Sequence, residues 1–182
     1  APEPAPTPAA DPIPVMGPAG VDPEMIWGGI QWVLKSESQG NPSALQLNHD
    51  GAGLSFGLIQ WPQSTGDLGI ILAYFAEQAP IELAQIMGGP AALQQLLAVV
   101  TSPVRATRMS LSLWTEPWLS RFRALGSSDR FIRLQWQFLM SEDVHYQAAV
   151  AVTNELGWTE RSFALAFDRA VQQGTGAARR AL

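Results

Sequence analysis

The sequence lacks cysteine altogether and has only two histidines, and both scarcities exclude kinds of chemistry. Without cysteine, the 182 residues can form neither a disulfide framework nor a thiol-based redox or zinc site. His49 and His145 are too few to build a histidine-rich metal cluster. A Ser-His-Asp triad through either histidine remains formally possible, but no Gly-x-Ser-x-Gly turn is expected to support it. We therefore expect neither a metal nor a cofactor.

Basic residues are also scarce. The chain has one lysine and ten arginines but sixteen acidic residues, which gives a net charge of -5 and a pI near 4.9. Proteins that bind nucleic acid need a basic surface. We therefore expect no nucleic-acid partner, whereas an acidic surface tolerates a cationic or neutral polymer.

Long apolar runs are missing too. No stretch approaches the ~20 apolar residues that span a bilayer, so no membrane insertion is expected. The first residues lack the charged head and apolar stretch of a signal peptide. Residues 1–21 are instead rich in Ala and Pro, a composition that favours extended geometry and buries little apolar area. We expect a disordered linker or tail there, one folded domain over 22–182, and an exported protein, secreted or periplasmic, or an excised domain.

The folded part carries helical periodicity. Asp22 can cap a helix, Pro23 suits its first position, and apolar residues then recur at helical spacing up to about Ser36 or Glu37. Residues 43–61 are dense in Asn, Asp and Gly and predict a small β-hairpin. Further helices are expected over 68–78, 81–87, 91–100, 116–125, 128–140, 142–156 and 159–173. The sequence therefore predicts a mainly α domain with a small β-hairpin.

Two acidic residues lie on different predicted elements, Glu37 at a helix end and Asp50 in the hairpin turn. Hydrolysis of a sugar acetal needs such a pair, one protonated to release the leaving oxygen and one ionised to activate water. A carboxylate at a helix C-terminus is disfavoured by the dipole, which together with burial would keep Glu37 protonated. The alternative is a solvated glutamate and an ordinary Asp-Gly turn.

The residues around this pair resemble two enzyme families. Residues 37–42 (Glu-Ser-Gln-Gly-Asn-Pro) with 57–60 (Gly-Leu-Ile-Gln) are similar to a pattern of lytic transglycosylases and goose-type lysozymes. Residues 50–67, from Asp-Gly-Ala-Gly-Leu-Ser-Phe-Gly to Ser-Thr-Gly-Asp, resemble bacterial chitosanases without a gap. Weaker similarity to chitosanases covers 144–149 and 167–174. Both families share the lysozyme-like fold, with a β-hairpin at the active-site cleft, and the resemblance implies the same here.

The resemblance also implies roles. Glu37 would be the general acid, Asp50 the general base, and Ser55 would replace a threonine hydroxyl that helps to hold the attacking water. Asp67 matches an acid that binds an amino sugar. Ala52 replaces an arginine of the family, and Ser141 lies near another expected arginine, so the basic network around the acid looks altered and the substrate stays open.

Three further residues near the hairpin are candidates for substrate binding. Trp61 is the best candidate for stacking on a sugar ring, although a core position is the alternative for any tryptophan. Gln60 and Asn48 could hydrogen-bond sugar hydroxyls, and Asn48 could equally form a turn.

The leading hypothesis is a monomeric, inverting glycoside hydrolase of lysozyme type that cleaves β-1,4 bonds in peptidoglycan, and so degrades cell wall. A chitosanase is the close alternative, followed by a lytic transglycosylase, which needs only one carboxylate. A non-catalytic module that binds cell wall is the alternative from another class.

Overall fold

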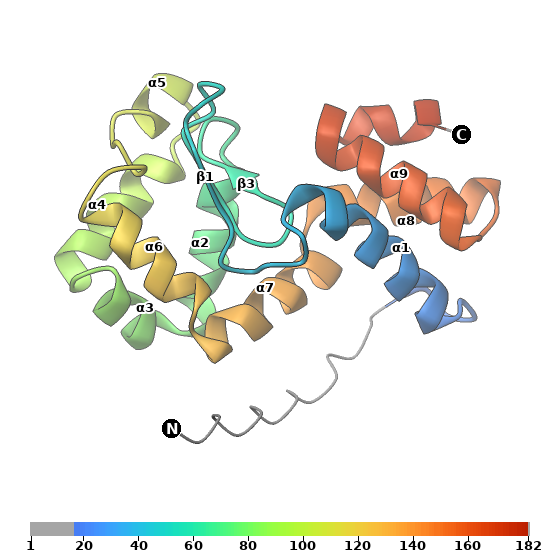
Figure 1. The fold of residues 1–182 in the computed structure, drawn as a ribbon, viewed down its shortest axis with the longest axis horizontal. Helices are drawn as coiled ribbons and strands as arrows, with labels where there is room; N and C mark the ends of the chain where they lie inside the picture. The colour runs from blue at the N-terminus through green and yellow to red at the C-terminus, as the bar shows by residue number, and fades with distance from the viewer. Residues whose placement is uncertain (1–16, 182) are drawn as a thin grey trace, which may run out of the picture.

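The computed structural model describes residues 17–181, and helices account for most of them (Figure 1). The α-helices are α1 (Pro23–Glu37), α2 (Asp67–Gln78), α3 (Pro80–Ile86), α4 (Pro90–Val100), α5 (Arg105–Arg108), α6 (Trp118–Gly126), α7 (Asp129–Ser141), α8 (Val144–Leu156) and α9 (Glu160–Gln173). A 3₁₀ helix, η1 (Thr175–Ala181), follows, and the strands are β1 (Leu45–Leu47), β2 (Leu54–Phe56) and β3 (Trp61–Pro62). The expected mainly α fold with a small β element is confirmed. The short helices α5 and η1 were not expected, and most of the expected tail lies outside the described residues.

Helix α1 begins and ends as its sequence predicts. The Asp22 side chain accepts a hydrogen bond from the backbone N–H of Glu24 at 2.9 Å, and Pro23 occupies the first turn. Ile26, Ile30 and the neighbouring Val33 and Leu34 are fully buried on one face. Because the helix ends at Glu37, the apolar face that anchors α1 in the core also fixes this carboxylate at the edge of the core.

The three strands form one antiparallel sheet in the order β1-β2-β3. Ser55 at the centre of β2 pairs with Gln46 on one side and Pro62 on the other. The turn after β2 needs glycine, because Gly57 has a φ of +83° and a Cβ there would clash with the side-chain oxygen of Gln135. Gln135 is fully buried, accepts from the N–H of Leu58 at 3.1 Å and donates to the carbonyl of Pro42 at 3.0 Å. One side chain of α7 therefore holds both the segment before β1 and the turn between β2 and β3.

The helices form two groups with the sheet between them (Figure 1). Helices α2 to α6 lie on one side, and α1, α8, α9 and η1 pack together on the other. Helix α7 packs against both α2 and α8 and so joins the groups. Among the described residues, no single helix is long and apolar enough to cross a membrane, and only the α3–α4 pair, bent by 94°, passes that test together.

Candidate active-site cleft

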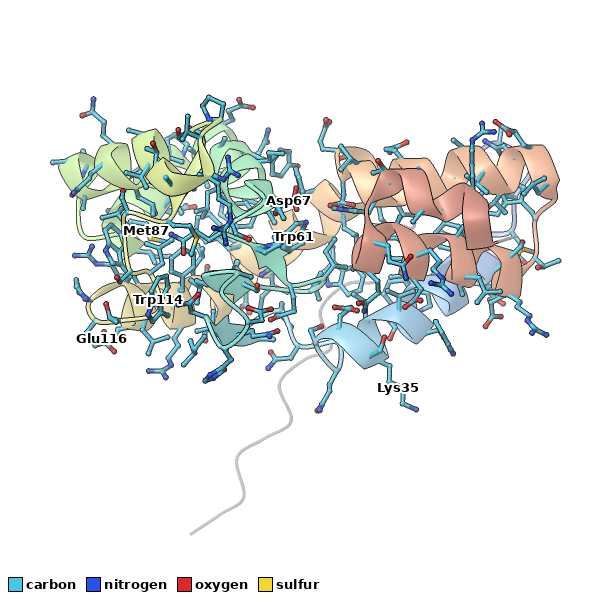
Figure 2. All side chains as sticks on the ribbon, turned by 90° about the horizontal axis from the view of Figure 1, so that it is seen from above. Lys35, Trp61, Asp67, Met87, Trp114 and Glu116 are labelled. Atoms are coloured by element: carbon cyan, nitrogen blue, oxygen red, sulfur yellow. The ribbon has the colours of Figure 1, made fainter. Side chains whose placement is uncertain are left out.

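A cleft of about 850 Å³ lies where the sheet meets the ends of α1, α8 and α9. Of the residues that the sequence proposed for the site, the cleft lining includes Glu37, Asp50, Ser55, Gln60, Trp61 and Asp67. Figure 2 shows Trp61 and Asp67 at the boundary between the two groups of helices. Residues far apart in the chain thus converge on one cavity, and Asn48 is the one proposed residue that does not line it.

Glu37 enters the cleft from the last position of α1 and is half-buried. Burial raises the pKa of its carboxyl, and the nearby charge of Asp168 on α9 raises it further, against a hydrogen bond donated by the Gln172 side chain, which lowers it. Among the described residues no arginine or lysine lies within ion-pair distance of Glu37, and the single lysine, Lys35, points into solvent (Figure 2). The environment therefore favours the protonated acid.

Asp50 approaches the cleft from the loop between β1 and β2. Its side chain is exposed, and one oxygen accepts a hydrogen bond from the N–H of Ala52 at 2.9 Å. The carboxylate is thus held by its own turn, and its second oxygen makes no hydrogen bond to another described residue. This is an acid open to water, in contrast with Glu37.

Ser55 lies in the floor of the cleft, 5% exposed. Its hydroxyl makes no hydrogen bond within residues 17–181, which leaves it available to water or a ligand. Residues 53–57 read Gly-x-Ser-x-Gly, the sequence of a nucleophile elbow, but an elbow places its serine on a strand-to-helix turn. Ser55 is instead paired on both sides in mid-strand, and in the described part of the chain it makes no hydrogen bond to a histidine, so it forms no triad with His49 or His145.

Asp67 and His145 face the cleft from α2 and α8. Asp67 accepts a hydrogen bond from the Thr65 hydroxyl at 2.6 Å. The imidazole Nδ1 of His145 lies 3.3 Å from Asp143 Oδ1 but is not aligned for a hydrogen bond. Burial lowers the pKa of His145, but the carboxylate of Asp143 and the charge of Asp67 outweigh it, and the net direction is upward. His145, which the sequence suggested only as a possible triad histidine, therefore lies near Asp67 with a pKa above that of an ordinary histidine.

The prediction that Trp61 stacks on a sugar ring is wrong. Its side chain is 1% exposed, packs edge-on against Phe138 with ring centroids 5.7 Å apart, and donates from Nε1 to Asp143 Oδ2 at 2.9 Å. A sugar cannot stack on a ring whose faces are covered by protein. Trp61 instead ties β3 to the start of α8 and so holds two walls of the cleft together.

Gln60 and Asn48 are both occupied by the backbone of the hairpin. Gln60 lines the cleft with a φ of +57°, and its amide donates to the carbonyls of Gly57 and Ala44, so only its oxygen is free to accept. The Asn48 side chain accepts from the N–H of Gly53 at 2.9 Å. Asn48 thus forms the turn, the alternative that its sequence position left open, and it does not reach the cleft.

Helices α8 and α9 supply cleft residues that the sequence did not single out as candidates for the site. Besides His145, the ends of these helices place Val144, Gln172, Gln173 and Gly174 in the cleft lining. They belong to the two C-terminal segments that showed the weaker similarity to chitosanases, and this was the signal that could have pointed to them.

Comparison of the chain with family models, with curated proteins and with solved structures finds no match.

Proposed function

We propose that the protein is a glycoside hydrolase of lysozyme type, which cleaves β-1,4 bonds of peptidoglycan with inversion at the anomeric carbon. The observation that carries the proposal is the contrast between two carboxyl groups on one cleft. Glu37, at the end of α1, is half-buried with a raised pKa, whereas Asp50 is exposed on the loop between β1 and β2. Two acids whose environments differ in this way suit an acid and a base.

The chemistry follows from these positions. Glu37 gives its proton to the glycosidic oxygen as the bond from that oxygen to the anomeric carbon breaks. Asp50 takes a proton from a water molecule whose oxygen forms the new bond on the opposite face of the sugar. The Ser55 hydroxyl, which makes no hydrogen bond to another described residue, holds this water. Inversion requires room for water between the two carboxyl groups, and an open cleft between α1 and the hairpin loop provides such room.

Peptidoglycan is favoured over chitosan by the surroundings of Asp67. A carboxylate alone there would attract the ammonium group of glucosamine, but Asp67 lies near His145 and helps to raise its pKa, and a protonated imidazole would offset the charge of Asp67. A neutral N-acetylated sugar gains nothing from a full negative charge on Asp67. It therefore loses nothing when the charge of Asp67 is neutralised. Chitosan therefore stays the second candidate, with Asp67 as the residue that favours it.

Purified peptidoglycan and chitosan, each incubated with the protein and analysed by mass spectrometry, test the proposal. We expect hydrolysed muramyl ends from peptidoglycan and losses of about 10²–10⁴-fold in rate for Glu37→Gln and for Asp50→Asn. Glu24→Gln, an exposed acid of α1 outside the cleft, is the matched control and should keep the parental rate.

The other outcomes identify the alternatives. Anhydro-sugar ends with an active Asp50→Asn variant would mean a lytic transglycosylase. Products from chitosan alone would mean a chitosanase. Binding of peptidoglycan without product, equal in the parent and in Glu37→Gln, would mean a non-catalytic module.

A further inference from the structure

A second cavity begins where the catalytic cleft ends. We name it the α2 groove: it has a volume of about 620 Å³ and follows one face of α2 between the α4–α5 connection and the end of α7. Thr65 lines both the cleft and the groove, which are therefore neighbours at the start of α2. From Gly66 to Glu77 the groove follows eleven residues of helix, which corresponds to about 16 Å.

Close backbone packing shapes the groove. A Cβ on Gly69 would overlap the carbonyl oxygen of Val100, so glycine lets the end of α4 lie directly against α2. Beside it, the groove is lined by Ile70, 53% exposed, and by the half-buried ring of Tyr74. The groove thus has a floor of small and apolar residues and a polar rim.

A positive charge without an acidic partner lies at the end of the groove next to the cleft. Arg108 is only 9% exposed, and its guanidinium donates to the carbonyls of Ser64 and Ser102 alone. Three of its five N–H groups are used in this way, and within residues 17–181 no carboxylate lies within ion-pair distance. A buried guanidinium in this state attracts an anion.

Two carboxylates without basic partners among the described residues also line the groove. Glu77 and Glu142 are exposed on the rim, and neither forms an ion pair with a described residue. Glu142 lies close enough to Tyr74 to contribute to the raised pKa of that phenol, after burial. The groove therefore carries a buried positive charge at its end next to the cleft and two exposed carboxylates on its rim.

We propose that the α2 groove binds the peptide stem of peptidoglycan while the glycan lies in the cleft. The proposal rests on the proposed function. Stem peptides leave the sugar through a short chain with an acidic residue followed by a diamino acid, so they carry both of the charges that the groove complements. The carboxylate of the acidic residue pairs with Arg108, and the ammonium of the diamino acid lies between Glu77 and Glu142. Four extended residues reach about 13–14 Å, which fits the length of the groove.

The first test measures binding of a peptide alone, without catalysis. The tripeptide L-Ala–γ-D-Glu–L-Lys is titrated into the ¹⁵N-labelled chain, with the backbone amides of Gly66 and Gly69 as reporters. The Glu77→Gln/Glu142→Gln double variant, whose exposed positions leave the fold intact, should bind about three- to tenfold more weakly. The Glu24→Gln control should bind as the parent does. No shift at the groove, or equal affinity of the double variant and the parent, overturns the proposal.

The second test compares peptidoglycan strands with the same strands freed of their stems by an amidase. The parent should cleave the intact strands faster, and the double variant should lose that preference while it cleaves the freed strands at the parental rate. Equal cleavage of both strands by the parent would refute the peptide site in the groove but would be consistent with the proposed hydrolase. Peptide binding at the groove without cleavage of either strand would refute the hydrolase but would be consistent with the peptide site.

Discussion

Replacing Asp143 by Asn tests whether one buried carboxylate holds two walls of the cleft. Asp143 is 2% exposed and caps α8. Its Oδ1 accepts from the N–H groups of His145 and Tyr146 at 2.9 and 3.0 Å, and its Oδ2 accepts from Trp61 Nε1 at 2.9 Å. An asparagine has only one oxygen, so its NH₂ group must face either the indole N–H or the two backbone N–H groups.

The magnitude follows from that mismatch. A hydrogen bond to a charged group contributes about 1.5–3 kcal/mol, and a buried donor without an acceptor costs about 1–3 kcal/mol. We expect Asp143→Asn to lower the free energy of unfolding by about 2–4 kcal/mol, which corresponds to roughly 5–15 °C in Tm for a chain of this size. Urea unfolding followed by tryptophan fluorescence measures the change.

Asp22→Asn is the matched control, because Asp22 also caps a helix but is exposed and accepts a single bond from Glu24 N–H. Asparagine caps as well as aspartate where water can satisfy its amide, so this variant should lie within about 0.5 kcal/mol of the parent. If Asp143→Asn proved as harmless as Asp22→Asn, the reasoning about the buried carboxylate would be refuted.

Three further predictions concern charge in the cleft. Asp168→Asn should lower the pKa of Glu37, so the fall in kcat at alkaline pH should move to lower pH, since activity is lost as the acid deprotonates. Gln172→Leu removes the donor that favours ionised Glu37 and should move the same limb to higher pH; shifts in one common direction would contradict this reading. Because the pKa of folded His145 is raised, its contribution to stability is present below its unfolded value of about 6.5 and is lost as pH rises through the folded value. The parent should therefore exceed His145→Gln in unfolding free energy by more at pH 5 than at pH 9, and a difference that is the same at both pH values would exclude the ion pair.

Local features of the chain were predictable from sequence. The cap at Asp22, the end of α1 at Glu37 and the hairpin that carries Asp50 follow from capping, periodicity and turn composition, which involve only nearby residues. The third strand, Trp61–Pro62, is two residues long, too short for alternation to reveal it.

The roles that depend on distant partners were not predictable in this way. Trp61 is buried in the core and donates its indole N–H to Asp143, 82 positions away, and nothing beside Trp61 in the sequence indicates that partner. His145 and Gln172 reach the cleft because α8 and α9 pack against each other and α9 packs on α1. Such contacts depend on tertiary packing, and a local sequence pattern carries no information about it.

The anomeric configuration of the first product tests the two-carboxylate site most directly. Proton NMR during cleavage of a soluble peptidoglycan fragment resolves the α and β signals of the new reducing end before they equilibrate. If Glu37 acts as acid and Asp50 directs water to the opposite face, the α signal appears first and Asp50→Asn abolishes it. A β signal first, or an anhydro end with no reducing signal, would show that Asp50 does not activate water.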